Sequence, residues 1–349
     1  MTDQKYDNTA LQTAIVILNW NGQKMLADFL PSVLKYTDTS IANVIVADNA
    51  SSDNSVEWLK IHYPEVRIIE LDQNYGFAGG YNKALEQVHA TYYVLLNSDI
   101  EVTANWLPPL VSVLENDEQV AAVQPKLLAY HNKTSFEYAG ASGGYIDKFG
   151  YPFCRGRILN TLEEDRGQYN NPVSVMWATG ACLVIRAKQF HAAGGFDARF
   201  FAHMEEIDLC WRLKNQNFQI KVVPQSTVYH LGGGTLPNNS PRKLFLNYRN
   251  NLLLLYKNVP DNERAGIFFS RFILDILSAF LYLIKGQPEL FVQVFKARFA
   301  YRKMRKHYHK STSGEQKSLI AHKEIFPKSI LWSYFVKKHK TFDSLSFKK

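Results

Sequence analysis

Short apolar runs alternate with longer stretches of helical periodicity through the first 115 residues. The apolar runs cover residues 14–19, 43–47, 66–71 and 92–96, and the helical stretches between and after them cover residues 23–36, 54–62, 78–89 and 105–115. Runs that are apolar at nearly every position are typical of strands buried on both faces. Their alternation with helices predicts an α/β fold with a Rossmann-like, doubly wound mixed sheet.

Polar side chains gather where these apolar runs end. In doubly wound sheets, ligands bind at the carboxyl ends of the strands. We therefore expect a polar ligand site along one edge of the sheet. The residues that the pattern places there are Asn19, Asn21, Asp48, Asn49, Asp53, Asn74, Asn97, Ser98 and Asp99.

The second half of the chain changes character. Residues 130–172 are rich in Gly, Tyr and Asn and favour an irregular excursion at the site rather than core. Strand patterns return at residues 181–185 and 220–223, and helical patterns cover residues 245–256 and 265–284. We divide the chain into a catalytic-size domain at residues 1–240 and a helical extension at residues 241–349.

Composition and charge narrow the class of protein. The chain has 349 residues, of which 46% are hydrophobic and 21% charged, and this excludes a disordered chain or a disulfide-stapled miniprotein. Residues 1–240 hold 18 Lys and Arg against 25 Asp and Glu, whereas residues 241–349 hold 22 against 7.

Three cysteines without metal-ligand spacing indicate buried, reduced thiols. The polar N-terminus lacks a secretory pattern, so we expect a cytoplasmic protein.

Two loops suit a nucleotide or a sugar. The loop at residues 48–53 offers oxygens to a nucleobase or a ribose, but Asp53 is equally suited to capping the following helix. In the loop at residues 74–82, Gly76 and Gly80 lie at a strand-to-helix turn, where backbone N–H groups suit a diphosphate. The chain has no G-x-x-x-x-G-K-[ST] segment, which disfavours a P-loop.

Two further groups carry candidate chemistry. Asp99 can hold one Mg²⁺ or Mn²⁺, with His230 as the candidate second ligand, although a histidine beside glycines also serves as an ordinary structural residue. Glu205 and Glu206 are crowded carboxylates, which raise one another's pKa and suit a general base. Asp208 and Arg212 have the spacing of an ion pair on a helix.

Five motifs in order resemble those of family 2 glycosyltransferases. They lie at residues 15–22, 46–53, 74–82, 95–99 and 205–212, and the similarity extends over residues 13–260. The nearest resemblance is to the rhamnosyltransferase-like branch of bacterial surface-polysaccharide synthesis. It implies a GT-A fold and an inverting transfer from dTDP-L-rhamnose or a UDP-sugar to a hydroxyl of a glycan or polyprenyl-linked glycan, in O-antigen or capsule synthesis.

The resemblance also implies roles for individual residues. Asp48 would lie at the nucleobase, and the loop that contains Gly76, Phe77, Gly80 and Asn82 would lie near the donor. Asp99 would be the remaining carboxylate of the metal motif, and His230 a metal or diphosphate ligand. Two positions depart from the family pattern: Asn97-Ser98-Asp99 replaces Asp-x-Asp, and Glu205-Glu206 replaces Glu-Asp. The base position falls on Glu206, with Glu205 as the alternative.

The basic extension predicts attachment to a surface. Residues 265–284 approach the length of a bilayer span, but Arg271 and Asp275 interrupt them one helical turn apart. Basic and aromatic residues alternate after residue 285 and suit the anionic inner face of a membrane. We expect peripheral attachment there. The alternative is that the aromatic side chains pack on the catalytic domain or on a second copy of the chain in a homodimer.

Three other classes of protein fit less well. Gly140-Ala141-Ser142-Gly143-Gly144 matches the G-x-S-x-G segment of serine hydrolases, but the residues after it do not favour the required helix. A nucleic-acid-binding module would explain the basic extension and leave the strand-end carboxylates without a role, so we expect no nucleic-acid partner. A catalytically inactive scaffold of a polysaccharide assembly complex remains the main alternative.

Overall fold

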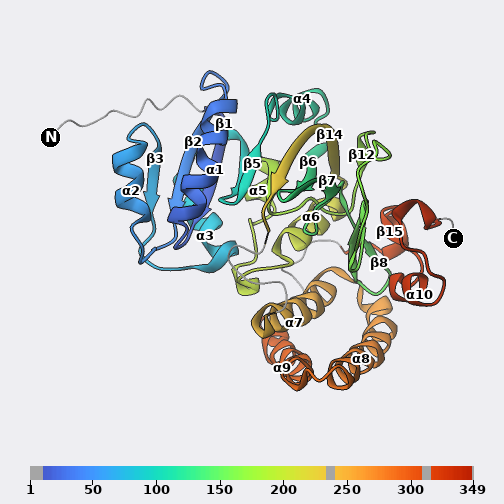
Figure 1. Ribbon diagram of the computed structural model, residues 1–349. Coiled ribbons are helices and arrows are strands. Elements are labelled where there is room, and N and C mark those ends of the chain that lie inside the picture. The colour runs from blue at the N-terminus through green and yellow to red at the C-terminus, as the bar shows by residue number, and fades with distance from the viewer. Residues whose placement is uncertain (1–10, 233–239, 309–315, 348–349) are drawn as a thin grey trace.

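A ten-stranded mixed sheet forms the centre of the part of the chain that the structure describes, residues 11–232, 240–308 and 316–347 of a computed structural model (Figure 1). The main strand order is β12-β14-β6-β13-β4-β1-β2-β3, with β5 paired to β14 and β7 to β6. The strands are β1 (Leu11–Asn19), β2 (Ala42–Asp48), β3 (Arg67–Glu70), β4 (Ala90–Asn97), β5 (Ile100–Val102), β6 (Val120–Ala129), β7 (Asn132–Phe136), β12 (Val173–Ser174), β13 (Cys182–Arg186) and β14 (Gln219–His230).

Helices cover both faces of this sheet, as the alternating pattern predicts. In β1, Ile15 and Ile17 pack in one apolar cluster, whereas Ala14 and Val16 pack in the other. The first cluster includes side chains of α1 (Gln23–Tyr36), α2 (Ser55–His62) and α4 (Pro108–Asn116). The second includes side chains of α3 (Gly76–Leu85), α5 (Ala187–Ala192) and α6 (Glu205–Asn215). The doubly wound mixed sheet is therefore confirmed.

The strand register sets the polar edge. β1 is parallel to both β2 and β4, and Asn19 stands opposite Asp48 while Leu18 stands opposite Asn97. The polar residues after these strands consequently meet at one edge. β13 runs antiparallel to β4, and β14 runs parallel to β6 with a register shift between Val223 and Thr227. That irregularity explains why the apolar pattern predicts only residues 220–223, although the strand continues to His230.

Residues 130–172 do not form the irregular excursion that their composition predicts. They contain β7 and most of a second, five-stranded sheet of order β11-β10-β9-β8-β15. Its strands are β8 (Gly144–Asp147), β9 (Pro152–Cys154), β10 (Arg157–Ile158), β11 (Thr161–Leu162) and β15 (Ile325–Phe326). Strands of two to four residues are too short to give a readable alternation of polar and apolar positions, which is why the sequence pattern misses them.

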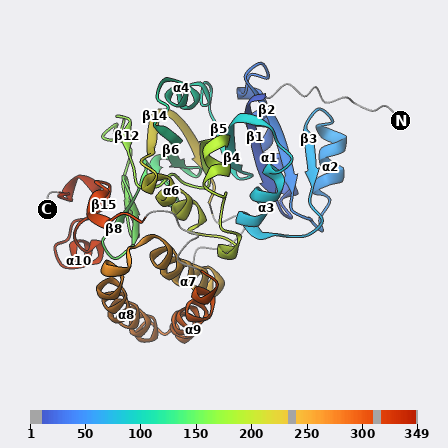
Figure 2. The same ribbon diagram turned by 180° about the vertical axis from the view of Figure 1, so that it is seen from behind.

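Three long helices lie together below the sheets in the view of Figure 1, and the same arrangement is seen from behind in Figure 2. They are α7 (Pro241–Asn258), α8 (Asp261–Ile284) and α9 (Pro288–Met304). After them the chain returns to the second sheet, where β15 pairs with β8 and α10 (Ile330–Phe335) follows. The remaining short helical turns are η1 (Ala198–Phe200), η2 (Arg305–His307), η3 (Leu319–Ala321) and η4 (Phe342–Ser344).

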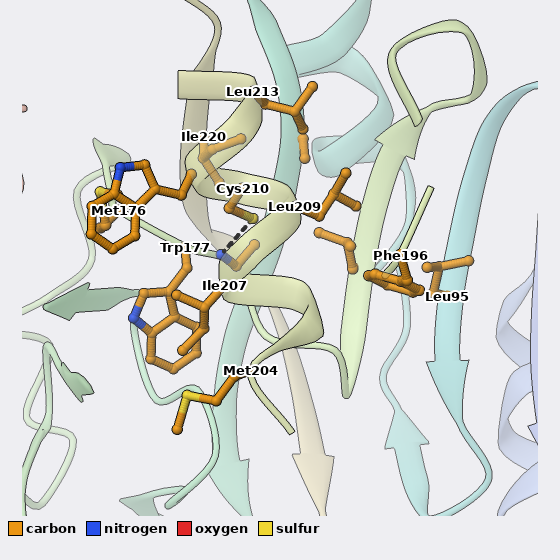
Figure 3. Packing of buried hydrophobic residues seen from close by; sticks show 14 of the residues in the cluster. Leu95, Met176, Trp177, Phe196, Met204, Ile207, Leu209, Cys210, Leu213 and Ile220 are labelled. Atoms are coloured by element: carbon orange, nitrogen blue, oxygen red, sulfur yellow. Dashed lines mark hydrogen bonds between the residues drawn. The ribbon is translucent and has the colours of Figure 1, made fainter. Parts of the chain in front are cut away.

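Side chains of α6 pack in one apolar cluster with residues from many other parts of the chain. Figure 3 shows Leu209 pointing toward Phe196 and Leu95, while Ile207 and Met204 lie beside Trp177. The Cys210 thiol accepts a hydrogen bond from the Ala178 N–H at 3.5 Å. All three cysteines are free and buried, in agreement with the sequence prediction. This packing fixes α6, and with it the pair of glutamates at its N-terminus.

The apolar face of α8 points outward. The helix is long and apolar enough to cross a bilayer, with a mean hydropathy of 2.0 over its best 18-residue window, and one such helix is weak support for a membrane span. Only 17% of that window is buried, unlike a core helix of a soluble domain. Arg271 and Asp275 are buried and paired at 3.2 Å, so the two charges that interrupt the apolar stretch face the protein.

Candidate functional site

A single cavity of about 1160 Å³ lies at the carboxyl ends of the central strands. It brings together eleven of the residues that the sequence places in the site: Asn21, Asn49, Asn74, Gly76, Phe77, Asn97, Ser98, Asp99, Glu205, Glu206 and His230. Seven others lie outside its lining: Asn19, Asp48, Asp53, Gly80, Asn82, Asp208 and Arg212. Their contacts show how they shape the walls of the cavity.

Asp48 and Asn19 form a buried pair beneath the cavity. The Asn19 Nδ2 donates to Asp48 Oδ1 at 2.9 Å, and the hydroxyl and N–H of Ser51 donate to the same carboxylate at 2.6 and 2.8 Å. Asp53 accepts from Ser55 and from the N–H of Gln23 at 3.1 Å, so it holds the starts of α2 and α1. Asp53 therefore binds the first N–H of α2, close to the helix-capping role that the sequence leaves open, although Asn54 occupies the N-cap position.

The loop before α3 is held by side-chain amides. The Asn49 Nδ2 donates to Asn74 Oδ1 at 3.1 Å and to the Gly76 carbonyl at 3.0 Å, and Asn74 Oδ1 accepts the Gly76 N–H at 2.8 Å. Gly76 has φ +70°, and a Cβ there would stand 2.5 Å from the Phe201 ring. Gly80 packs against Asn49, and Asn82 binds both backbone groups of Phe196. Glycine at position 76 is therefore required by both conformation and space.

His230 lies between two carboxylates. Its Nε2 stands 3.2 Å from Asp99 Oδ1, and its Nδ1 stands 3.2 Å from Glu137 Oε1. Burial disfavours the charged ring, but Glu137 and Asp99 outweigh it and raise the pKa of His230 to about 10. Burial likewise opposes the Asp99 carboxylate, yet the attraction of His230 prevails and lowers the pKa of Asp99.

The spacing of this arrangement fits a divalent cation, which would displace the proton from Nε2 of His230 on binding. Two ligand atoms at adjacent corners of an octahedral Mg²⁺ or Mn²⁺ stand about 3 Å apart, close to the observed separation of Asp99 Oδ1 and His230 Nε2. Glu137 contacts the other ring nitrogen, as carboxylates commonly do behind a metal-bound histidine. Within the described residues no cluster of three or more His, Cys, Asp or Glu is arranged to hold a metal. Two protein ligands would leave positions for water and substrate oxygens.

Among the carboxyl groups of the cavity lining, Glu205 and Glu206 have strongly raised pKa values. Burial raises the pKa of Glu206 to about 7. Burial and the neighbouring charge of Glu206 raise the pKa of Glu205 well above its ordinary value. The Oε2 atom of each side chain is buried without a protein hydrogen-bond partner. A carboxylate of this kind can accept a proton from a hydroxyl at neutral pH.

Asp208 and Arg212 support α6 rather than line the cavity. Arg212 Nε lies 2.9 Å from Asp208 Oδ2, which confirms the ion pair that their spacing predicts. Lys257 and Asn258 of α7 also bind the Asp208 carboxylate, at 2.8 and 2.9 Å. Burial opposes this charge, but Lys257 and Arg212 prevail and lower the pKa of Asp208 to about 2. The group therefore fastens α6 to α7.

Several lining residues are absent from the sequence prediction. Glu137 lies in the stretch that its composition marks as irregular, and nothing in the local pattern identifies it. The far end of the cavity is lined by α8 and α10, through Leu274, Leu277, Leu281, Leu331 and Phe335. Basic residues also border the cavity: Lys24, Arg157, Arg242, Lys243, Arg271 and Lys285. The helical pattern predicts α8 but not which of its faces meets the cavity.

The serine-hydrolase segment is structural. Ser142 is fully buried, and its hydroxyl donates to the Tyr169 carbonyl at 3.3 Å and accepts from Arg155 at the same distance. The segment leads into β8 rather than into a helix. Ser142 is thus not presented as a nucleophile, in agreement with the sequence argument against this class.

Comparison with known proteins identifies the family. The family model of "Glycosyl transferase family 2" matches residues 14–187, which contain the strand-end residues of β1, β2 and β4. The chain belongs to glycosyl transferase family 2. It is therefore a glycosyltransferase, and the resemblance of its motifs is confirmed.

Two curated relatives indicate where this family 2 glycosyltransferase falls. It is 24% identical to N-acetylglucosaminyl-diphospho-decaprenol L-rhamnosyltransferase of Mycobacterium tuberculosis, over 62% of this chain and 75% of the relative. It is 28% identical to the O-antigen biosynthesis protein RfbC of Myxococcus xanthus, over 59% of this chain and 16% of the relative. Both relatives agree with the expected branch of rhamnosyltransferase-like and polysaccharide-synthesis proteins.

A solved structure supports the fold. The crystal structure of GalNAc-T7 with UDP, GalNAc and Mn²⁺ superposes with a TM-score of 0.58 at 17% identity, over 76% of this chain. The present chain spans about half the length of that structure, 51% of it being covered. The family 2 glycosyltransferase described here accordingly has the GT-A fold that its motifs imply.

Proposed function

We propose that this glycosyltransferase transfers a sugar, with inversion, from a nucleoside-diphosphate sugar to a hydroxyl of a glycan or polyprenyl-linked glycan in the synthesis of a bacterial surface polysaccharide. The observation that carries the proposal is the shared cavity. Glu206 lines the same cavity as Asp99, His230 and Gly76 at the start of α3, which supports the proposal. A base, an anion site and a sugar-sized volume are the parts that such a transfer needs.

The donor would occupy the end of the cavity beneath β1, β2 and β4. Asn21, Asn49, Asn74 and Ser98 present amides and a hydroxyl there. The rhamnosyltransferase relative supports dTDP-L-rhamnose as the first donor to test, and UDP-sugars are the alternative. Asp48, beneath this end, would contribute by fixing the Asn19 and Ser51 side chains.

Asp99 and His230 would hold Mg²⁺ or Mn²⁺ beside the donor diphosphate. A bound divalent cation would neutralise the negative charge that develops on the leaving diphosphate. Glu137 would keep the Nε2 of His230 directed toward Asp99 by contacting Nδ1. The Mn²⁺ in the GalNAc-T7 structure is consistent with this assignment.

Glu206 would act as the general base. As the acceptor hydroxyl forms its bond to the anomeric carbon, its proton would pass to Glu206 Oε2. The bond between that carbon and the diphosphate oxygen would break on the opposite face, with its electron pair leaving on the nucleoside diphosphate. Glu205, whose pKa is raised by burial and by Glu206, is the alternative base.

The acceptor would enter from the end formed by α8 and α10. Leu277 and Leu281 line the cavity and are 56% and 54% exposed. The wall that α8 contributes to the cavity is thus apolar. Lys285 and Arg157 supply positive charge nearby. This combination suits an amphiphilic acceptor with a hydrocarbon chain and an anionic linkage.

The same helices would attach the enzyme peripherally to the inner face of the cytoplasmic membrane. Phe269, Phe280, Ile284 and Phe299 are large apolar side chains that α8 and α9 leave exposed. Lys and Arg residues of α9 and η2 flank them and would favour anionic lipid. A second copy of the chain covering this face in a homodimer is the competing occupant.

A thermal-shift screen tests the proposal. The purified protein would be heated with UDP-, dTDP- and GDP-sugars, each with Mn²⁺, Mg²⁺ or EDTA, because a ligand that binds only the native state raises its melting temperature. We expect a rise for one nucleotide class that disappears with EDTA. A rise that survives EDTA would remove the cation from the proposal. If no nucleotide sugar gives a rise and none supports transfer, the scaffold interpretation replaces the enzyme.

A further inference from the structure

The segment that leads into the glutamate pair has an unfavourable backbone conformation. Phe201, His203 and Met204 have φ values of 66°, 71° and 74°, and none of them is a glycine. A non-glycine residue with φ in this region is strained. Three such residues within four positions persist only if surrounding contacts hold them. Since Glu205 follows Met204 directly, these contacts also determine where the glutamates lie.

One buried side chain binds three carbonyl groups of this segment. Asn250 of α7 is fully buried, and its Nδ2 donates to the carbonyls of Phe200, Ala202 and His203 at 2.9, 2.8 and 2.8 Å. The neighbouring Arg249 donates to Asn250 Oδ1 at 2.9 Å and also to the Phe200 carbonyl. A single amide therefore binds the carbonyl groups on both sides of the strained residues.

The same segment contacts the loop at the donor end. The Phe201 carbonyl accepts the N–H groups of Phe77 and Ala78 at 2.8 and 3.2 Å, at the start of α3. The Phe201 ring also lies against Gly76, where no side chain would fit. Residues 200–204 are consequently held between α3 on one side and Asn250 on the other. A shift of this segment would move the base and the donor loop relative to each other.

We propose that Asn250 is a positioning residue for catalysis, which holds Glu206 in register with the donor by binding the three carbonyls of the strained segment at residues 200–204. This inference rests on the proposed role of Glu206 as the base. It gives α7 a part in catalysis although Asn250 does not line the cavity.

Two substitutions test the role of Asn250. Asn250→Ala removes the amide, and Asn250→Asp keeps its size but replaces the donor with an acceptor facing three carbonyls. A misplacement of about 1 Å at a reacting centre can lower a rate about 100-fold. We expect kcat to fall by about that factor in both variants, while donor binding, measured by titration calorimetry, changes less than threefold.

The pH profile separates positioning from a general loss of stability. The titratable groups coupled to the glutamate pair are Asp208, Cys154 and Cys210, and Asp208 is neutralised by Lys257 and Arg212. When the segment relaxes and water reaches Glu206, the acidic limb of the profile should move to lower pH. The matched control is Leu110→Ala, which removes a fully buried side chain of α4 that packs in the apolar cluster on the other face of the sheet from α6. It should lower the melting temperature without moving the limb.

Glu206→Gln, assayed in parallel, separates the two hypotheses. If Glu206→Gln keeps normal turnover, the proposed base is wrong. If Glu206→Gln is inactive but both Asn250 variants keep wild-type kcat and the wild-type acidic limb, the positioning role of Asn250 is overturned. It is also overturned if Leu110→Ala lowers kcat and moves the limb as much as Asn250→Ala does.

Discussion

Glu137 Oε1 lies 3.2 Å from His230 Nδ1, on the opposite side of the ring from Asp99. The contact joins the end of β14 to the residue after β7. It leaves Nε2 as the nitrogen that faces Asp99 and the cavity. Partners of this kind orient metal-bound histidines, and their loss typically weakens metal binding 10- to 100-fold.

Glu137→Gln should therefore weaken binding of Mn²⁺ about 10- to 100-fold, as measured by titration calorimetry or by the electron paramagnetic resonance signal of free Mn²⁺. The control is Glu101→Gln, which removes an exposed partner of Lys133 on the adjacent strand β5 without touching His230. Equal Mn²⁺ affinity in the Glu137→Gln protein and the wild type would contradict the role of Glu137.

Glu205→Gln should stabilise the protein at neutral and alkaline pH. Burial and Glu206 raise the pKa of Glu205 above the ordinary value of 4.5, so the folded state holds a proton that the unfolded state releases. Stability is then lost as pH rises above that value, and a neutral amide avoids the loss. We therefore expect a higher free energy of unfolding for the variant than for the wild type at pH 8.

The gain for Glu205→Gln should shrink toward pH 4.5, where the carboxyl group is protonated in the folded state and about half protonated in the unfolded state. Urea unfolding at several pH values measures this dependence. A gain that stays constant between pH 4.5 and pH 8 would mean that the buried charge is not its cause.

The rate of transfer should depend on a group that ionises near pH 7. Burial raises the pKa of Glu206 to about 7, and the base must be deprotonated to accept the acceptor proton. We expect kcat/KM to rise about tenfold per pH unit below this value and to level off above it. Profiles with the donor and cation saturating measure it. An acidic limb near pH 4.5, the ordinary value for glutamate, would contradict a buried base.

Substitution of the exposed apolar face should abolish membrane attachment. Phe299 of α9 is 73% exposed, and Phe299→Asp together with Ile284→Asp places two charges on this face. We expect co-sedimentation with phosphatidylglycerol vesicles to fall about tenfold or more. Ile61→Asp is the matched control, because Ile61 is also 73% exposed but lies on α2. If the variant sediments like wild type but loses a dimer in solution, the face binds a second copy instead.

The sequence predicts the part of the fold that repeats a simple pattern. The runs before Asn19, Asp48 and Asn97 are apolar at nearly every position, so both the strands and their polar ends are readable. Glu137 and the second sheet are not readable, because β7 and the strands of that sheet have only two to five residues, and β15 pairs with β8 across a long distance in the chain. The sequence also does not predict the contacts of Asn250. The pattern of α7 predicts a helix, but only the folded structure shows that the Asn250 side chain binds the carbonyls before Glu205.

The site also contains some residues that the sequence predicts and others that it does not. The motif order identifies the residues that line the cavity in the first half of the chain, and the i,i+4 spacing predicts the Asp208–Arg212 pair. The sequence does not distinguish the residues that line the cavity from the residues that lie beneath its wall. Asp53 illustrates this limit. Its carboxylate lies near a strand end in a ligand motif, but it binds the first N–H of α2.

The most direct test of the account is the Glu206→Gln variant, assayed for both donor binding and transfer. The substitution removes the proton acceptor and preserves the size of the side chain. We predict that the melting-temperature rise with the preferred nucleotide sugar stays within about 1 °C of the wild-type rise, since donor contacts are retained. Transfer to the acceptor should fall by a factor of about 10² to 10⁴. Near-normal transfer by a variant that binds donor normally would contradict Glu206 as the base.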